Sequence, residues 1–155
     1  MTSFERSQHG YEISTDPTRL DVDAVHAYLV RSYWAKDIPK ATVARALRGS
    51  LCFGLYVQAS GAQVGFARVI SDLATYAYLC DVYVLEEHRG QGLSKWLIGA
   101  LLEHPDLAGL RRFVLATRDA HGLYSRFGFA PLAGPQKFME IVRPGLYSRA
   151  AGDPS

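Results

Sequence analysis

One run in the second half of the chain, residues 88–94, has the residue types of a phosphate-binding turn. It follows an apolar segment typical of a strand and opens an amphipathic segment typical of a helix. Gly90 and Gly92 carry no Cβ, so a ligand can approach the backbone closely there. The first turn of a helix also presents unpaired N–H groups and roughly half a positive charge. The run therefore predicts a site for a phosphate or pyrophosphate group.

Two common phosphate loops are excluded by their spacing. A P-loop requires Gly-x-x-x-x-Gly-Lys-Ser/Thr, which occurs nowhere in the chain. The dinucleotide-binding turn requires a third glycine three residues after the second, and Lys95 stands at that position. The phosphorylated ligand must therefore be of another kind.

The spacing resembles Arg-x-x-Gly-x-Gly/Ala, the pyrophosphate loop of the GCN5-related N-acetyltransferase (GNAT) superfamily. Arg89, Gly92 and Ser94 occupy the three marked positions. Ser94 departs from the family's usual Gly or Ala, but it is also small.

Two flanking segments extend the resemblance. Residues 80–85 resemble the family's fourth strand, and residues 123–129 resemble its Leu-Tyr-x-x-x-Gly-Phe segment. With the loop, they cover roughly residues 75–131 in the family's order and spacing. The fold implied is α/β, with a mixed, mostly antiparallel sheet, a splayed central strand pair and flanking helices.

The resemblance implies that acetyl-CoA is the cosubstrate and enters the gap between the splayed strands. Val82 and Val84 are implied to bind its pantetheine arm through their backbones, although plain core packing would suit both valines equally. The pyrophosphate would be held mainly by main-chain N–H groups of Arg89, Gly90, Gln91, Gly92, Leu93 and Ser94.

Tyr124 is the residue that the resemblance implies for proton transfer to the departing thiolate of coenzyme A. A phenol, with a pKa of about 10, is a weaker acid than a thiol, with a pKa of about 8.5. Tyr124 is therefore expected to act as much by hydrogen-bonding the sulfur as by donating its proton.

Asp81 is the candidate for a general base or an anchor for the acceptor. An alkylamine is almost fully protonated at neutral pH, so its proton must be removed before it attacks. Polyamine acetyltransferases have a Glu-Asp pair at what look like matching positions, but Cys80 replaces the first member here. A solvated carboxylate at a strand end remains an equal alternative for Asp81. Cys80 as an acyl carrier is disfavoured, because the family needs no covalent intermediate.

Two large aromatic residues, Tyr33 and Trp34, lie in a break between the first two expected helices. In this family such helices flank the acceptor site. With Tyr78, these rings could contact a cationic amine through their faces. Core packing is the alternative.

Composition restricts the remaining classes of function. The net charge is +2 and no block of five Lys or Arg residues occurs, so a nucleic-acid partner is unsupported. No apolar stretch approaches the ~18 residues of a membrane span, and no His/Cys cluster has metal-ligand spacing. Cys52 and Cys80 both lie in apolar runs and are expected to be free thiols. We expect a single cytoplasmic domain over 1–155, without metal.

The expected elements follow from hydrophobic periodicity and turn residues. The final strand could exchange or pair between copies, giving a homodimer. The expected order is a polar tail over 1–9, a strand over 11–14, a helix opened by Asp16-Pro17 and reaching Arg31, a helix over 39–48, strands over 51–58, 63–70 and 75–85, a helix over 93–101, a strand over 112–116, a short helix capped by Asp119, a final strand over 138–142 and a second tail over 150–155.

The leading hypothesis is thus an enzyme that moves acetyl from acetyl-CoA to a primary amine of a small molecule or peptide, by direct attack in a ternary complex. A non-catalytic acyl-CoA sensor and a transferase for a longer acyl group are the alternatives.

Overall fold

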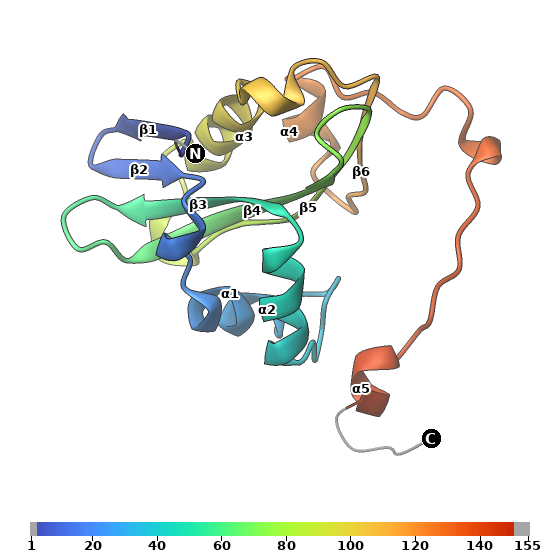
Figure 1. The fold of residues 1–155 in the computed structure, drawn as a ribbon, viewed down its shortest axis with the longest axis horizontal. Helices are drawn as coiled ribbons and strands as arrows, with labels where there is room; N and C mark the ends of the chain where they lie inside the picture. Colours follow the sequence, from blue (N-terminus) through green and yellow to red (C-terminus); the bar gives the residue numbers. More distant parts are fainter. Residues whose placement is uncertain (1–2, 151–155) are drawn as a thin grey trace.

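The computed structural model describes residues 3–150 and contains one six-stranded sheet. The strands lie side by side in their order along the chain (Figure 1). All neighbours are antiparallel except the last pair, which is parallel. The expected α/β fold with a mixed, mostly antiparallel sheet is therefore confirmed. The strands are β1 (Glu5–Gln8), β2 (Tyr11–Ser14), β3 (Leu51–Val57), β4 (Gln63–Ser71), β5 (Tyr76–Val84) and β6 (Arg112–Leu115).

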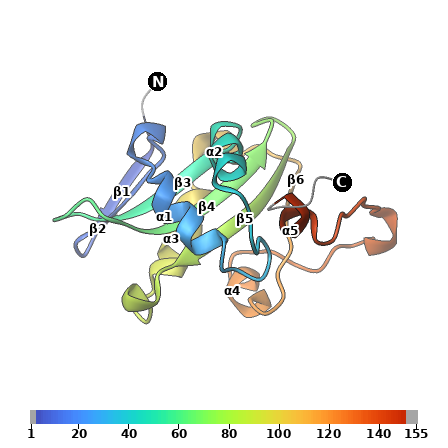
Figure 2. The ribbon, with the colours of Figure 1, turned by 90° about the horizontal axis from the view of Figure 1, so that it is seen from below.

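Helices cover both faces of the sheet. Figure 1 shows α1 and α2 below the sheet and α3 and α4 above it, and Figure 2 shows α1 and α2 crossing in front of the strands. No helix within residues 3–150 is both long and apolar enough to span a membrane. The helices are α1 (Val22–Leu29), α2 (Lys40–Arg48), α3 (Leu93–Leu102), α4 (His121–Ser125) and α5 (Leu146–Ala150), and short 3-10 turns lie at Pro17–Arg19, Glu86–His88, Pro105–Leu107 and Pro135–Lys137.

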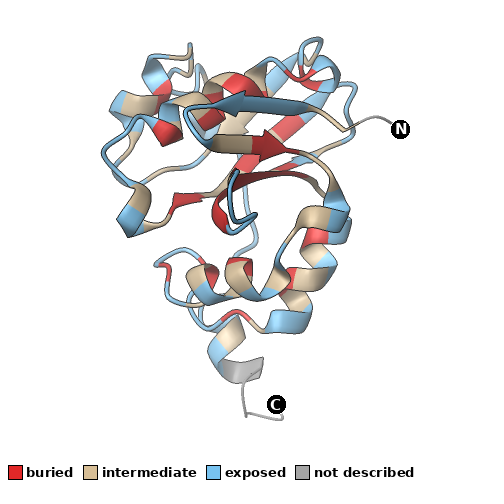
Figure 3. Cartoon of the chain, turned by 90° about the vertical axis from the view of Figure 1, so that its left-hand side faces the viewer, coloured by how far each residue is buried: buried red, intermediate tan, exposed pale blue. Residues whose placement is uncertain are grey.

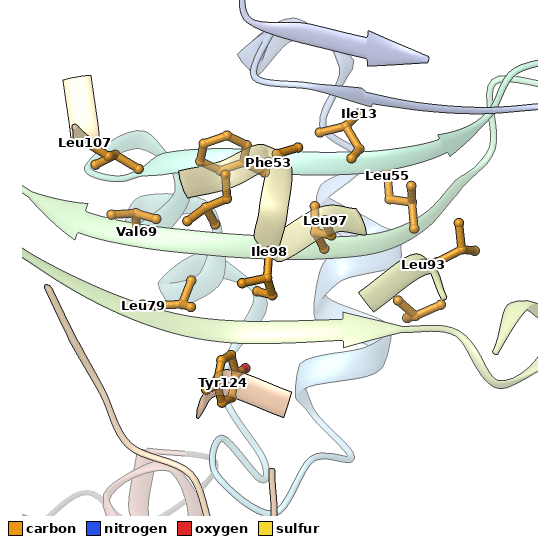
Figure 4. Close-up of a cluster of buried hydrophobic side chains, with 14 of the residues drawn as sticks. Ile13, Phe53, Leu55, Val69, Leu79, Leu93, Leu97, Ile98, Leu107 and Tyr124 are labelled. Atoms are coloured by element: carbon orange, nitrogen blue, oxygen red, sulfur yellow. The ribbon is translucent and has the colours of Figure 1, made fainter. Parts of the chain in front are cut away.

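Two apolar cores result, one on each face of the sheet. Because side chains alternate along a strand, β3 contributes Phe53 and Leu55 to one core and Cys52 to the other. Figure 4 shows the first core, where Leu97 and Ile98 of α3 lie against the sheet. In Figure 3 the buried segments are concentrated in the sheet and on the inner sides of the helices. The rigid sheet thus fixes the positions from which the site is built.

The first helix starts later than the sequence suggests. Asp16 does cap a turn, accepting the N–H of Thr18 at 2.9 Å, but this turn is the three-residue 3-10 helix Pro17–Arg19. The chain then restarts at Asp21, whose carboxylate accepts the N–H of Ala24 at 3.0 Å and caps α1. A single helix from Asp16 to Arg31 is therefore wrong, because a second capping aspartate competes with the first.

The expected polar tail over 1–9 is also wrong in part, since β1 forms within it. All four of its residues are exposed, and it pairs with β2 through a turn in which His9 and Gly10 both have positive φ. An edge strand of polar residues has no apolar alternation by which it could be predicted. Of the other expected tail, residues 151–155 lie outside the described residues.

Two expectations near the C-terminal end are wrong as well. Residues 138–142 form no strand and pair with no neighbour within the described chain. Asp119 does not cap α4, which begins after Ala120 without a side-chain cap. The remaining helices and strands lie within a residue or two of their expected bounds.

Candidate active site

The last two strands of the sheet separate part-way along their length. β5 and β6 pair from Tyr76 opposite Arg112 to Leu79 opposite Leu115, and β6 then ends while β5 continues to Val84. A cleft of about 470 Å³ opens there. The splayed central pair expected from the sequence is thus present. The predicted site residues that line the cleft are Tyr33, Trp34, Tyr78, Asp81, Val82 and Tyr124.

The glycine turn follows the end of β5. Gly90 and Gly92 have φ of 84° and 78°, in the left-handed region that favours glycine. A Cβ at either position would meet no atom within 4 Å, so the space above the turn is open. Gly92 is also the N-cap of α3 and provides no side-chain cap.

Unpaired N–H groups therefore face this space. Within residues 3–150, the main-chain N–H groups from Gly90 to Lys95 donate to no acceptor. The first hydrogen bond of α3 runs from the N–H of Trp96 to the carbonyl of Gly92, at 3.0 Å. Successive free N–H groups at a helix N-terminus suit a phosphate or pyrophosphate, because the helix dipole also favours negative charge. The turn thus fits the group that the sequence predicts.

The side chain of Arg89 turns away from the open space. Its Nε donates to the carbonyl of Val84 at 2.8 Å, and one terminal nitrogen donates to the hydroxyl of Tyr28 at 2.9 Å. Arg89 therefore braces the turn against β5 and α1. Val84 is buried, its carbonyl is engaged by Arg89, and it does not line the cleft, whereas Val82 does.

The side chain of Gln91 connects the turn to β2 by a hydrogen bond. Its amide donates to the carbonyl of His88 at 3.1 Å and to the hydroxyl of Tyr11 at 3.2 Å. The Tyr11 hydroxyl also lies 2.8 Å from Nδ1 of His88. Contacts from β2 thus hold the turn in place.

Asp81 lies at a β-bulge. β5 has one more residue than β4 between the pairs Arg68–Cys80 and Phe66–Tyr83, and Asp81 has a φ of 54°. Aspartate tolerates this left-handed conformation better than most residues. The bulge turns the carboxylate to Trp34, whose indole N–H donates at 2.8 Å, and to Arg68, whose Nε donates at 2.7 Å. Both carboxylate oxygens are therefore engaged.

Tyr124 reaches the cleft from α4. Its side chain is 8% exposed and lies beside β5 at the margin of the first core (Figure 4). Burial raises the pKa of Tyr124 to about 12, so its hydroxyl keeps the proton at neutral pH. Within residues 3–148, this hydroxyl has no hydrogen-bond partner. It is a proton-bearing group that remains available to a ligand.

Tyr33 and Trp34 form one wall of the cleft. Their rings are perpendicular with centroids 5.1 Å apart, and they are 51% and 40% exposed. The guanidinium of Arg118 lies 3.8 Å from the centroid of the Tyr33 ring. These aromatic residues are therefore not buried in the core, and their part in binding an acceptor stays a prediction.

Cys80 also lines the cleft, and its side chain is a thiol. Burial raises its pKa to about 12, and the negative charge of Asp81 adds to the shift while Arg68 opposes it. The thiolate, which is the nucleophilic form, is therefore disfavoured. Within the described residues, Cys52 and Cys80 are both free thiols, and no three His, Cys, Asp or Glu side chains converge as metal ligands would.

Sequence reasoning missed Arg68 and the loop after β6. Arg68 meets Asp81 only because the bulge shifts the register of β4 against β5. The loop residues Thr117–Ala120 line the cleft from the β6 side, and Asp119 places an exposed carboxylate there. The run of polar residues Thr117–Asp119, shortly after a strand that borders the expected gap, was the available signal for Asp119.

Comparison with known proteins agrees with this geometry. The model of the acetyltransferase (GNAT) family matches residues 11–129, which is most of the chain. The chain belongs to the GNAT family. A Gibberella zeae protein, named as a putative acetyltransferase, is 39% identical over 137 residues, covering 75% of this chain and 76% of its own.

Two solved structures share the fold. A crystal structure from Xanthomonas campestris pv. campestris, described as a putative GNAT-family acetyltransferase, has 57% identity and a TM-score of 0.87, covering 92% of this chain and 99% of its own. A putative acetyltransferase from Deinococcus radiodurans has a TM-score of 0.69 over 97% of this chain and 98% of its own. At 20% identity, this second likeness shows the fold alone.

Proposed function

We propose that this GNAT protein transfers the acetyl group of acetyl-CoA to a primary amine of a small molecule or peptide, by direct attack within a ternary complex. The observation that carries the proposal is the run of unpaired main-chain N–H groups from Gly90 to Lys95. This run begins six residues after the end of β5, the strand that lines the cleft. It suits the pyrophosphate of coenzyme A, while the cleft suits the thioester end.

In this reaction the neutral amine nitrogen forms a bond to the thioester carbonyl carbon, the carbon–sulfur bond breaks, and the nitrogen releases a proton to solvent. The departing thiolate then needs a proton or a hydrogen bond. Tyr124 is proposed for this role, because its hydroxyl is protonated and unpartnered. Since its pKa is raised further above that of a thiol, hydrogen-bonding of the sulfur contributes more than full proton donation.

Asp81 is proposed as an anchor of the acceptor site rather than as the base. Its two oxygens accept hydrogen bonds from Arg68 and Trp34, and these contacts hold the carboxylate against the cleft wall. The carboxylate instead fixes the indole of Trp34 in the cleft wall. The ring face of Trp34, together with Asp119, would favour a cationic amine in the cleft, whereas the guanidinium of Arg118 already lies over the Tyr33 ring.

We propose a cytoplasmic location as well, which is supported by Cys52 and Cys80 being free cysteines within the described residues. The proposal includes no metal ion, because the reaction needs only the groups described above.

Calorimetric titration of the purified protein with acetyl-CoA tests the proposal. We expect micromolar binding by the unmodified chain, weakened at least tenfold by Gly92→Glu, because the added carboxylate would repel the pyrophosphate. Gly92→Ala carries the same backbone strain without the charge, and should weaken binding less.

Gly61→Glu is the matched control. Gly61 also has a positive φ, 75°, and open space around its Cβ position, but it lies in the hairpin between β3 and β4. This variant should bind acetyl-CoA as the unmodified chain does. Absence of binding by a folded sample, or equal weakening by Gly61→Glu, would contradict the proposal.

A further inference from the structure

The charged side chains that line the cleft differ in whether the protein neutralises them. The carboxylate of Asp81 is paired with Arg68 at 2.7 Å. The other two charged residues, Arg118 and Asp119, lie on the loop that follows β6. They form no ion pair with each other or with any other residue of the described chain. The cleft therefore keeps one cation and one anion for a bound molecule to meet.

The guanidinium of Arg118 is held at the cleft by an aromatic ring. Its central carbon lies 3.8 Å from the centroid of the Tyr33 ring, so the cation covers the ring face. Among the donors of Arg118, only the main-chain N–H has a partner within residues 3–150, the Tyr33 hydroxyl at 3.4 Å. The side-chain N–H groups thus form a planar fork without an acceptor. Such a fork matches the two oxygens of a carboxylate.

The loop keeps Asp119 apart from this guanidinium. The main-chain N–H of Ala120 donates to the hydroxyl of Thr117 at 3.0 Å, which closes the loop, while Arg118 is drawn to Tyr33. The carboxylate of Asp119 is exposed and accepts no hydrogen bond from the described part of the chain. Neighbouring residues of opposite charge that do not pair leave both charges to a third molecule.

The rest of the cleft lining is aromatic, aliphatic, hydroxyl or thiol in type and brings no fixed charge. Burial raises the pKa of Tyr78, and it raises the pKa values of Cys80 and Tyr124 to about 12. These three groups are therefore neutral at neutral pH. The balance of charge that an acceptor meets is thus set by Arg118 and Asp119.

We propose that the acceptor is a small zwitterion, an amine that also carries a carboxylate, as a free amino acid does. This inference rests on the transfer reaction proposed above and names its acceptor class. Arg118 binds the carboxylate through its fork, and Asp119 holds the ammonium group until its proton passes to solvent. A diamine would bring a second cation against Arg118, and an acid without an amine would bring an anion against Asp119. Both are disfavoured by repulsion.

Competition between matched acceptors tests the proposal. The protein is incubated with acetyl-CoA and an equimolar pool of the standard amino acids, their amides and their decarboxylated amines, and the products are quantified by mass spectrometry. The amides have a less basic amine than the acids, and the decarboxylated amines have a more basic one. A preference over both therefore reports the carboxylate and not the basicity of the amine. We expect the kcat/KM of the preferred amino acid to exceed both others at least tenfold.

Two variants separate the roles of the two charges. Arg118→Gln should lower the ratio of kcat/KM for the acid to kcat/KM for its amide at least tenfold, because the fork is lost. Asp119→Asn should lower kcat/KM for the acid and the amide alike, since both carry the amine, and so keep their ratio. Arg126→Gln is the matched control, because Arg126 is exposed, does not line the cleft and forms no ion pair within the described residues. It should keep the ratio of the unmodified chain.

Binding is measured separately from transfer, by saturation-transfer NMR of the same pool with protein that is saturated with CoA, which has no acetyl group to give. Amino acids that bind more tightly than their amides, with no transfer from acetyl-CoA to any amine, would support the zwitterion site and contradict the proposed reaction. Transfer at equal kcat/KM to an acid and its amide would overturn the zwitterion site and leave the reaction standing. An acid-to-amide ratio that Arg118→Gln leaves unchanged would also overturn it.

Discussion

At the scale of single residues, three of the ionisable groups that line the cleft, those of Cys80, Asp81 and Tyr124, differ in their surroundings. The thiol of Cys80 is held neutral by burial and by the charge of Asp81. Asp81 itself is engaged by Arg68 and Trp34. Tyr124 keeps both its proton and an unpartnered hydroxyl. This difference is why we assign the leaving-group role to Tyr124.

Tyr124→Phe should lower kcat at least tenfold and leave the Kd for acetyl-CoA nearly unchanged, because only the hydroxyl is removed. The pKa of Tyr124 is raised to about 12, so the hydroxyl stays protonated as the pH rises through the ordinary tyrosine range. The ratio of the kcat of the unmodified chain to the kcat of Tyr124→Phe should therefore stay constant from about pH 7 to about pH 10.

Tyr76→Phe is the control for this measurement, since Tyr76 is on the same strand as Tyr78 but does not line the cleft. Its kcat should match that of the unmodified chain. A ratio for Tyr124→Phe that falls to one below about pH 10 would show that the hydroxyl had ionised, against the stated role.

At the scale of the elements, the bulge in β5 decides where the acceptor wall lies. One extra residue puts Asp81 in a left-handed conformation. Its carboxylate then contacts both Trp34, in the loop between α1 and α2, and Arg68, on β4. The side chains of Arg68 and Asp81 are only 16% and 9% exposed, so this ion pair is poorly solvated. A partner lost from such a pair leaves a buried charge uncompensated.

Asp81→Asn should therefore lower the free energy of unfolding by about 3 kcal/mol. Asp81→Ala should lower it further, by about 1 kcal/mol, because alanine tolerates a positive φ less well than asparagine. Urea denaturation measures both. Glu103 has an exposed carboxylate that forms no ion pair within the described chain. The control variant Glu103→Gln should therefore change the free energy of unfolding by less than about 0.5 kcal/mol. Equal effects of Asp81→Asn and Glu103→Gln would argue against a stabilising pair.

The same elements show what the sequence can predict. The glycine turn and α3 follow from local signals, namely two glycines and an apolar stripe at helical spacing. The register of β4 against β5 does not follow from local signals, because a one-residue bulge leaves no local sequence pattern. The contact between Arg68 and Asp81 depends on this register. The start of α1 was mistaken because Asp16 and Asp21 are equally good caps in sequence.

At the scale of the whole molecule, two buried thiols, those of Cys52 and Cys80, contribute to a loss of stability in alkali. Burial raises the pKa of the Cys52 and Cys80 thiols from an ordinary 9.0 to about 12. Above the ordinary value the unfolded chain releases these protons while the folded chain still holds them. Stability is therefore fully present below about pH 9 and is lost as the pH rises toward about 12.

The free energy of unfolding should accordingly be lower at about pH 10 than at about pH 8. The double variant Cys52→Ala/Cys80→Ala should show a smaller difference between the two pH values, whatever its absolute stability. Denaturant titrations at both values measure this. An unchanged difference in the double variant would assign the alkaline loss to other groups.

The measurement that tests the proposed activity most directly is acetyl transfer itself. The unmodified protein is incubated with acetyl-CoA and a pooled set of primary amines, and free thiol and acetylated products are quantified by absorbance and mass spectrometry. We expect thiol release that depends on an amine and matches the N-acetylated product in amount. Firm binding of acetyl-CoA without transfer to any amine would contradict the enzyme and favour a non-catalytic acyl-CoA-binding module.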